Sequence, residues 1–201
     1  MKKLFTQANI SITNTQIEKL SKYSEFLLEY NKKINLTRIT VPEDIIIKHF
    51  IDSVIILNYI DIPQNAKLAD VGTGAGFPGV PLKIFRPDID LTLVDSLNKR
   101  VVFLEQLLDL LSLDGKCVHA RGEELSRKPE YNKKYDIVTA RAVANITDLK
   151  KYCMGFLKES GKLIALKGVS EEINEGTIYS YNLTNGDGRR IIELSSTIQS
   201  L

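Results

Sequence analysis

The chain has 201 residues, of which 43% are hydrophobic and 26% are charged, and its 27 Lys and Arg against 25 Asp and Glu leave a formal net charge of +2. This length and composition are typical of one ordinary soluble domain. The near-neutral balance excludes a polybasic arm for nucleic acids. Residues 67–168 are mildly basic and the segment after Gly168 is acidic, so we expect any anionic partner to be contacted locally.

The first residues lack the pattern of a secretory leader. Polar Thr6 and Gln7 follow Leu4 and Phe5, so no apolar core of a signal peptide forms. The most apolar stretch, residues 45–57, is interrupted by charged side chains and is shorter than the ~20 apolar residues of a membrane span. We therefore expect a cytoplasmic protein that does not contact a membrane.

Two amphipathic helices are predicted in the first part of the chain. A capping box at residues 15–18, Thr-Gln-Ile-Glu, precedes apolar residues spaced by three and four, and this stripe runs to Ile34. Thr40 as a cap and Pro42 in the first turn predict a second helix, whose apolar stripe continues to Leu57. Residues 1–66 are expected to form a helical extension packed on the remainder of one compact unit.

Short β-rich runs alternate with helical stretches from Lys67 onward. The expected strands are residues 68–71, 91–94, 116–118, 136–139 and 162–166, each buried on both faces, with a helix at 101–113. This alternation predicts a Rossmann-like α/β domain over residues 67–201 with a mostly parallel sheet. Asn185-Gly186-Asp187-Gly188 lies between two further β-rich segments and predicts a C-terminal antiparallel hairpin.

A glycine-rich loop follows the first predicted strand. It reads Asp70-Val71-Gly72-Thr73-Gly74-Ala75-Gly76-Phe77-Pro78-Gly79. Open α/β sheets bind ligands outside the carboxyl ends of their strands, and glycine lets backbone amides approach a ligand closely. A tight turn without a ligand is the plainer alternative. Four glycines within eight positions favour a nucleotide-like ligand instead.

Two aspartates help to choose that ligand. Gly74, Gly76 and Gly79 also satisfy the GxGxxG dinucleotide pattern, so NAD is an alternative. Asp95, at the end of the second strand, could accept the ribose hydroxyls of NAD or of S-adenosylmethionine, or could simply cap the next helix. Asp70 would repel a pyrophosphate but attract the positively charged methionine portion of S-adenosylmethionine. The sequence therefore favours a methyltransferase.

Seven motifs occur in order between Ile34 and Gly168. They are Asn35-Leu36-Thr37, His49-x-x-Asp52-Ser53, the glycine loop, Asp95-Ser96-x-x-Lys99-Arg100, Arg121-x-Glu123-Glu124, Arg141-Ala142 and Leu166-Lys167-Gly168. Through these motifs the chain resembles the bacterial small-subunit ribosomal RNA guanine-N7 methyltransferase family, also called glucose-inhibited division protein B. The segment after Gly168 matches the family poorly.

The resemblance implies S-adenosylmethionine as cofactor and assigns roles to residues. The expected cofactor-binding residues, with Asp70 added from the charge argument, are Asp70, Gly72, Gly74, Phe77, Asp95, Ser96, Gly122, Glu123 and Arg141. Asp95 and Ser96 would hold the ribose, and Gly122 with Glu123 would flank the adenine. Gly122 departs from the family pattern, in which Ala or Val is more usual. Phe77 begins a helix and could equally serve the core.

The chemistry of the site narrows the target atom. Residues 139–142, after the fourth strand, lack the Asn/Asp-Pro-Pro-aromatic motif of many amine methyltransferases, and neither Cys117 nor Cys153 fits a nucleophile for pyrimidine carbon-5. Guanine N7 presents a lone pair and loses no proton, so positioning suffices without a general base. Arg141 is expected to orient guanine, a phosphate or the cofactor carboxylate, and Lys167 to hold an RNA phosphate. Surface salt bridging is the alternative for both.

Four upstream residues are expected to contact the RNA substrate. They are Asn35, Arg38, His49 and Asp52, which the resemblance places beside the guanine or the cofactor. His49 and Asp52 share one helical face, although a histidine on a helix is more often structural. The chain has only 2 His, so we expect no metal site.

The expected partner is small-subunit ribosomal RNA or the ribosomal subunit, and the expected active form is a monomer. Two other functions are compatible with parts of the pattern. An NAD-dependent oxidoreductase would use the overlapping GxGxxG loop. A non-catalytic ribosome-binding module would retain the fold alone, although the intact loop glycines and Asp95 argue against that alternative.

Overall fold

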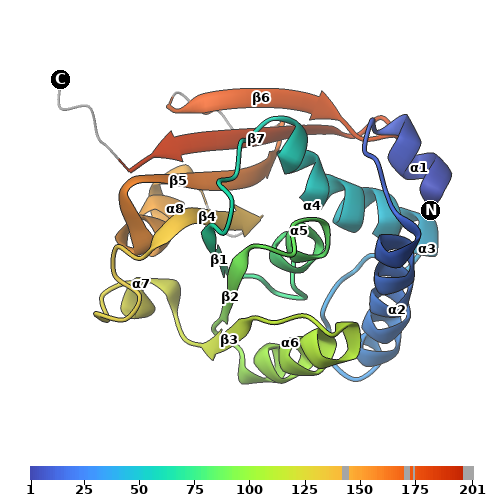
Figure 1. Ribbon diagram of the computed structural model, residues 1–201, viewed down its shortest axis with the longest axis horizontal. Helices are drawn as coiled ribbons and strands as arrows, with labels where there is room; N and C mark the ends of the chain where they lie inside the picture. The colour runs from blue at the N-terminus through green and yellow to red at the C-terminus, as the bar shows by residue number, and fades with distance from the viewer. Residues whose placement is uncertain (142–144, 170–172, 174, 197–201) are drawn as a thin grey trace.

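A twisted sheet of seven strands forms the centre of the computed structural model, which describes residues 1–141, 145–169, 173 and 175–196 (Figure 1). The strands are β1 (Lys67–Val71), β2 (Asp90–Asp95), β3 (Lys116–His119), β4 (Tyr135–Arg141), β5 (Leu157–Gly168), β6 (Thr177–Asn182) and β7 (Gly188–Ser195). Their order across the sheet is β3-β2-β1-β4-β5-β7-β6. β1 to β5 pair in parallel, whereas β7 is antiparallel to both β5 and β6. The predicted fold class and the C-terminal hairpin are therefore confirmed.

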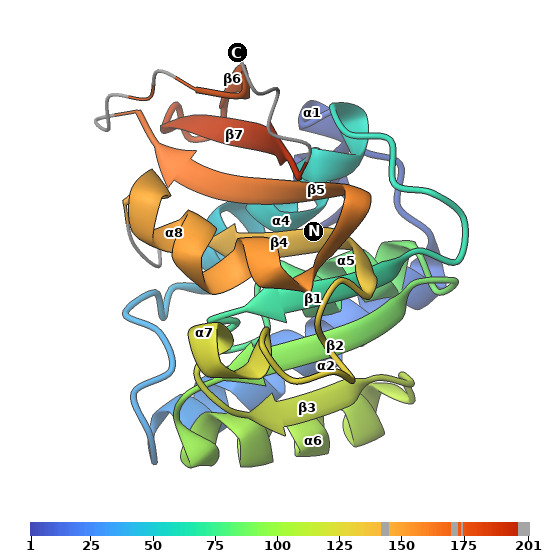
Figure 2. The same ribbon diagram turned by 90° about the vertical axis from the view of Figure 1, so that its left-hand side faces the viewer.

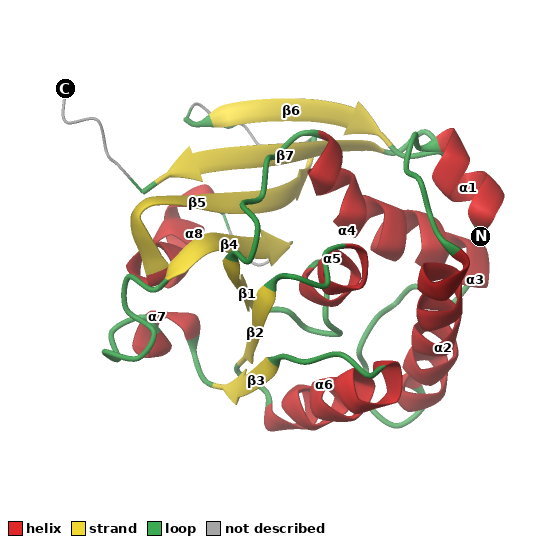
Figure 3. Cartoon of the chain, in the orientation of Figure 1, coloured by secondary structure: helices red, strands yellow, loops and turns green. Residues whose placement is uncertain are grey.

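Helices cover both faces of the sheet (Figures 2 and 3). The helical segments that precede β1 are α1 (Lys2–Gln7), α2 (Asn14–Asn31), α3 (Pro42–Ile45), the π-helical η1 (Ile46–Ile51), α4 (Asp52–Val54) and the 3-10 η2 (Ile55–Asn58). Those between the strands are α5 (Gly79–Phe85), α6 (Asn98–Leu111), α7 (Gly122–Leu125), α8 (Ile146–Cys153) and the 3-10 η3 (Met154–Phe156). α5 and α6 cover one face together with the N-terminal helices, and α7 and α8 cover the other.

Alternation of side chains along the parallel strands separates two hydrophobic cores. Leu68 of β1 lies in the core that also contains Leu20 of α2 and Leu104 of α6. The neighbouring Ala69 points to the opposite face, where it joins the core containing Leu149 of α8. The N-terminal helices thus share their apolar contacts with the sheet, because successive strand residues face opposite sides.

The N-terminal helices differ from the sequence prediction at their ends. The capping box of α2 is formed by Thr13 and Gln16, since the Thr13 hydroxyl accepts from Gln16 N at 3.2 Å and Gln16 Oε1 accepts from Thr13 N at 2.9 Å. The predicted box at residues 15–18 is wrong because the helix begins one turn-defining pair earlier. α2 ends at Asn31, so Ile34 lies beyond it. Pro42 begins α3 as predicted, but Val41 rather than Thr40 occupies the cap position.

The five predicted parallel strands are present, with one difference in burial. β1, β2, β4 and the second half of β5 are buried on both faces. β3 is at most half-buried along its length, because it is the edge strand of the sheet and has no strand beyond it. The predicted helix at 101–113 corresponds to α6.

Candidate functional site

A cavity of about 720 Å³ opens beside the carboxyl ends of β1, β2 and β4. We call it the central cavity; its lining consists of Leu36, Thr37, Arg38, His49, Gly72, Thr73, Gly74, Ala75, Phe77, Asp95, Ser96, Arg100 and Arg141. The adenine-side compartment, of about 300 Å³, adjoins it and is lined by Val71, Gly72, Val94, Asp95, Ser96, Ala120, Arg121, Gly122, Glu123 and Tyr152. The loop-side compartment, of about 660 Å³, adjoins it at Leu36, Thr37, Arg38 and Arg100 and adds Asn35 and Thr40.

The glycine loop forms one wall of the central cavity from backbone. Gly72 and Gly74 adopt φ values of 69° and 60°, which side-chain-bearing residues rarely adopt. The N–H groups of Gly72 and Thr73 donate to the Val94 carbonyl at 2.9 and 3.1 Å, so the loop is tied to β2. This geometry exposes peptide groups, rather than side chains, to a ligand in the cavity.

Asp95 ends β2 where the central cavity meets the adenine-side compartment. Its Oδ1 accepts from Leu97 N at 2.9 Å, and its Oδ2 accepts from Gly74 N at 2.9 Å and from Arg100 Nη1 at 3.4 Å. A carboxylate offers about four acceptor positions, so one remains open and the long Arg100 contact is the one a ligand can replace. The Nε of Arg100 is buried and has no hydrogen-bond partner among the described residues.

Asp70 lies behind the loop and does not line the central cavity. Its carboxylate is fully buried and accepts from the Thr73 hydroxyl at 2.6 Å, from Gly79 N at 2.9 Å and from the Thr139 hydroxyl at 2.9 Å. Burial raises the pKa of Asp70, whereas these three hydrogen bonds act in the opposite direction. A Cβ at Gly79 would lie 2.9 Å from the Asp70 side chain, so only glycine fits there. Direct contact of Asp70 with a cofactor is therefore not what the geometry favours.

The adenine-side compartment brings together Ser96, Gly122 and Glu123, as the sequence predicted, and adds Tyr152 of α8. A Cβ on Gly122 would meet Val71 Cγ1 at 2.8 Å and the Tyr152 carbonyl oxygen at 3.2 Å. The glycine thus lets α8 approach the compartment closely. Nothing in the sequence distinguished Tyr152 from the other side chains of an amphipathic helix.

Phe77 is the centre of an aromatic stack at the cavity floor. The imidazole of His49 lies parallel to its ring at 4.5 Å between centroids, and Tyr23 stacks at 5.2 Å. The guanidinium carbon of Arg141 lies 4.8 Å from the centre of the same ring. Phe77 is almost fully buried and also lines the cavity, so it serves the core and the site together.

Arg141 is fixed by groups of the second predicted helix. Its Nη1 donates to the Lys48 carbonyl at 3.1 Å and to Asp52 Oδ2 at 3.4 Å, and its Nη2 donates to His49 Nδ1 at 3.2 Å. A guanidinium carries five N–H donors, and these contacts use three. The remaining two donors are available to a carboxylate, a phosphate or a base in the cavity. Ala142, named with Arg141 in the sequence motif, lies outside the described residues.

His49 is held as a neutral imidazole. Because arginine only donates, His49 Nδ1 must accept, and the ring proton therefore sits on Nε2 and points to the Thr37 hydroxyl at 2.8 Å. Burial first and Arg141 second lower the pKa of His49 from 6.5 to about 3. The Thr37 oxygen also accepts from Ile39 N at 3.0 Å, so its own proton remains to be donated.

Asp52 lies behind Arg141 rather than in the cavity. The residue is 4% exposed and accepts from the Tyr181 hydroxyl at 2.9 Å, while Arg189 Nε lies 3.7 Å from it. Burial raises the pKa of Asp52, and Arg141, Tyr181 and Arg189 act against that rise. The structure therefore gives Asp52 protein partners in place of the RNA contact expected from the sequence.

The other predicted substrate residues divide between two places. Asn35 and Arg38 line the loop-side compartment, and Arg38 also reaches the central cavity. Lys167 is buried in β5, opposite Arg190 of β7, and lines neither the central cavity nor the two compartments. Sequence reasoning did not identify Thr37 and Arg100 individually, although both fall inside quoted motifs.

The lining of the central cavity has an excess of positive charge. Three arginines, Arg38, Arg100 and Arg141, stand against the single carboxylate of Asp95, and His49 is neutral. Such a lining favours anionic groups. In the part of the chain that the structure describes, no group of three or more His, Cys, Asp or Glu could hold a metal ion. None of the described helices has the length and apolar character that a membrane crossing requires.

Comparison with known proteins identifies close relatives. A family model described as GidB, rRNA small subunit methyltransferase G, matches residues 16–185. The chain is 48% identical over 170 residues to ribosomal RNA small subunit methyltransferase G of Desulfitobacterium hafniense, covering 83% of this chain and 70% of that protein. It is 44% identical over 180 residues to the protein of the same name from Desulforamulus reducens, covering 88% and 75%.

A solved structure shares the fold at low sequence identity. It is a SAM dependent methyltransferase from Aquifex aeolicus, which superposes with a TM-score of 0.55 at 14% identity and covers 83% of this chain and 97% of that one. The order of the strands and the antiparallel end of the sheet are thus arranged as in a protein of that fold class.

Proposed function

The chain belongs to the GidB family of small-subunit ribosomal RNA methyltransferases, and on this premise we propose that it transfers the methyl group of S-adenosylmethionine to N7 of a guanosine in small-subunit ribosomal RNA. Family membership argues against the NAD-dependent oxidoreductase and the non-catalytic module. When bound, S-adenosylmethionine supplies a methyl group on a positively charged sulfur.

The residues of the central cavity and the adenine-side compartment fit that cofactor. Gly122, Glu123 and Tyr152 would enclose the adenine, and Asp95 would accept the ribose hydroxyls through its open position and the position that Arg100 now holds. The peptide groups at Gly72 and Gly74 would face the methionine portion. Asp70 would act one layer back, by holding the loop in this conformation.

One observation supports N7 as the target atom. Among the described lining side chains, only His49 and Asp95 could take up a proton, and both are occupied. His49 accepts from Arg141 at one nitrogen and donates to Thr37 from the other, and Asp95 is bound to donors of its own chain. Guanine N7 has no proton to lose, so it requires orientation and charge complementarity but no general base. The two unused donors of Arg141 and the Thr37 hydroxyl would provide the orientation.

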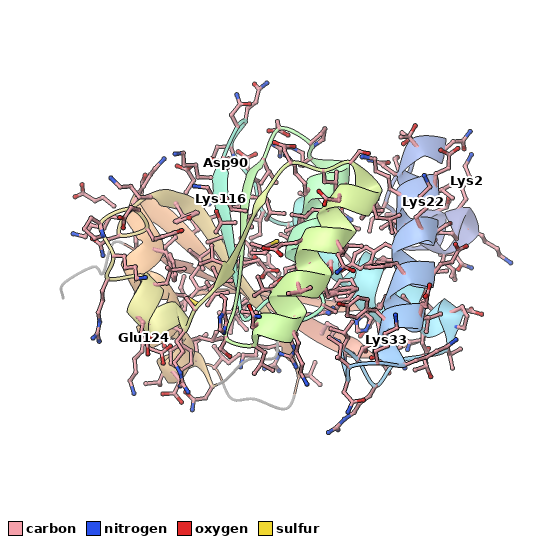
Figure 4. The ribbon with its side chains drawn as sticks, turned by 90° about the horizontal axis from the view of Figure 1, so that it is seen from below. Lys2, Lys22, Lys33, Asp90, Lys116 and Glu124 are labelled. Carbon is pink, nitrogen blue, oxygen red and sulfur yellow. The ribbon has the colours of Figure 1, made fainter. Side chains whose placement is uncertain are left out.

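The loop-side compartment is the proposed path of the RNA strand. It continues directly from the central cavity and is bounded by Arg38 and Arg100, whose positive charges suit a phosphate next to the target nucleotide. Lys33 and Glu124 lie toward this edge of the molecule, whereas Asp90 and Lys116 lie at the opposite ends of the strands (Figure 4). Lys116 therefore provides a control outside the proposed path.

This path can be tested by the salt dependence of RNA binding. Replacing Arg38 with Ala should weaken binding and reduce the slope of log K against log salt by about 0.7–0.9 if one phosphate contact is lost. Lys116→Ala should change neither quantity. Equal slopes for the two variants would exclude Arg38 from the RNA interface.

The function itself is tested by nucleoside analysis. Purified protein, S-adenosylmethionine and small-subunit RNA should give 7-methylguanosine on digestion and mass spectrometry, and Asp95→Ala should give none. A methyl group on another nucleoside, or no methyl transfer by the unaltered protein, would overturn the proposal. The proposal also places the protein in the cytoplasm with the ribosomal subunit, as a monomer, because one chain supplies the whole described lining.

A further inference from the structure

The C-terminal hairpin reaches the site from the far end of the chain. β6 and β7 lie along the edge of the sheet near α4 (Figure 1). From this hairpin the Tyr181 hydroxyl donates to Asp52 Oδ1 at 2.9 Å, and Arg189 Nε lies 3.7 Å from the same oxygen. Tyr181 is 8% exposed and Asp52 is 4% exposed, so this contact is almost free of water.

The other oxygen of Asp52 belongs to the cavity side. Asp52 Oδ2 lies 3.4 Å from Arg141 Nη1, and the Lys48 carbonyl accepts from the same nitrogen at 3.1 Å. Arg141 lies over Phe77 and lines the central cavity. A continuous set of contacts therefore runs from Tyr181 through Asp52 to Arg141, and it joins residues 129 and 89 positions apart in the chain.

We propose that the C-terminal hairpin is a positioning element of the methyltransferase site, in which Tyr181 and Arg189 hold Asp52 so that Asp52 fixes the Arg141 guanidinium over Phe77. The proposal rests on the proposed function. It gives a specific task to the segment after Gly168, whose sequence matches the family poorly. Tyr181 and Arg189 act through Asp52 and do not themselves line the central cavity.

The same strand contains a natural control. Tyr179 lies two residues before Tyr181 on β6 and donates its hydroxyl to Glu193 Oε2 at 2.9 Å, the same bond type at the same distance. Both tyrosine rings contact Tyr59. Glu193, however, pairs with Lys162 rather than with a residue of the site. Tyr179→Phe therefore removes an equivalent hydroxyl from the hairpin without touching the path to Arg141.

The first test compares the two Phe variants in steady-state kinetics. Tyr181→Phe should lower kcat about tenfold because a small displacement of an orienting group is costly for transfer, while the Kd for S-adenosylhomocysteine stays within about twofold and the melting temperature falls no more than in Tyr179→Phe. Tyr179→Phe should keep kcat. An equal loss of kcat in both variants, or a loss of stability alone in Tyr181→Phe, would show a merely structural role and overturn the proposal.

The second test uses the unliganded protein and needs no catalysis. The charged or titratable groups that face Asp52 are Arg141 from β4, Tyr181 from β6 and Arg189 from β7, and all three favour its ionised form. Loss of the Tyr181 hydroxyl should raise the pKa of Asp52, so carbon-13 NMR should show the carboxyl titrating at higher pH in Tyr181→Phe than in the unaltered protein. Activity of Tyr181→Phe should correspondingly be lost at a higher pH on acidification.

The two tests separate this inference from the function on which it rests. Tyr179→Phe should leave the Asp52 titration unchanged, and an identical titration in Tyr181→Phe would contradict the proposed support of Asp52. If the unaltered protein makes no 7-methylguanosine, the proposed function fails whatever the NMR result. A double variant, Tyr181→Phe with Asp52→Asn, should be no slower than Asp52→Asn alone, because both changes interrupt the same contact. Additive losses would contradict a shared path.

Discussion

The two walls of the central cavity are built in different ways. The wall at the sheet edge consists of the glycine loop after β1 and of Asp95 and Ser96 after β2, and it presents mainly peptide groups and one carboxylate. The opposite wall, which we call the helical wall, comes from residues 36–38 and His49, and it presents side chains. Backbone at strand ends suits a ligand common to many proteins of the fold, whereas side chains outside the sheet suit a particular substrate.

Internal hydrogen bonds fix the helical wall before any ligand arrives. Asn31, at the end of α2, accepts from Leu36 N at 2.8 Å and from Thr37 N at 3.0 Å, and it donates to the Thr37 carbonyl at 3.0 Å. His49 binds the Thr37 hydroxyl from the next helical segment. The comparison therefore predicts that changes in the sheet-edge wall affect cofactor binding and that changes in the helical wall affect the RNA.

The largest effect is expected in the sheet-edge wall. Asp95→Ala removes the acceptor of two ribose hydrogen bonds worth about 1.5–3 kcal/mol each, and Gly72→Val places a branched side chain at a φ of 69°. Each change should abolish methylation and raise the Kd for S-adenosylhomocysteine at least about 100-fold by calorimetry. Methylation retained in both variants would disprove the cofactor assignment of this wall.

Arg141 joins the two walls, so its removal should act mainly on turnover. Arg141→Ala should lower kcat about 100-fold because the donors that orient the base are lost, while circular dichroism shows an unchanged fold. The exposed Arg127 offers a matched control, and Arg127→Ala should keep full activity. A normal kcat in Arg141→Ala would remove this residue from the site.

A moderate effect is expected when the helical wall is loosened. Asn31→Ala removes three hydrogen bonds to residues 36 and 37 and should lower kcat/KM for RNA about tenfold, because the wall must then be ordered on binding. The Kd for S-adenosylhomocysteine should change less than about twofold. A parallel loss of cofactor affinity would mean that the two walls are not separate in function.

The smallest effect is expected from the titration of His49. Its pKa of about 3 keeps the imidazole neutral throughout the physiological range, so kcat should show no inflection near pH 6.5. A profile of kcat from pH 5.5 to 8 in the unaltered protein measures this. An inflection near 6.5 that disappears in His49→Gln would contradict the assigned tautomer.

The sheet-edge wall could be predicted because its residues are close in sequence. The strand, the glycines and Asp95 form local patterns, and the structure brings them together as expected. Asp70 was assigned wrongly to the cavity side, since sequence position alone cannot tell whether a carboxylate after a strand faces the ligand or the loop behind it. Its partner Thr139 lies 69 residues away and decided the matter.

The helical wall and its supports were less predictable. His49 and Arg38 came from the resemblance, but Asp52 was placed on the RNA because Tyr181, its partner, lies 129 residues further along the chain. The predicted capping box failed because Thr13 and Thr15 both have a suitable partner three residues later, and only the backbone geometry selects Thr13. Long-range contacts between side chains leave no periodic signal in one sequence.

The central claim is that this cavity positions guanine N7 for methylation without removing a proton. It is tested most directly by methyl transfer from labelled S-adenosylmethionine to small-subunit RNA in which guanosine is replaced by 7-deazaguanosine, which has carbon in place of N7. Unsubstituted RNA should accept label and the substituted RNA should accept none. Equal labelling of the two RNAs would contradict the account, because the methyl group would then reside on another atom.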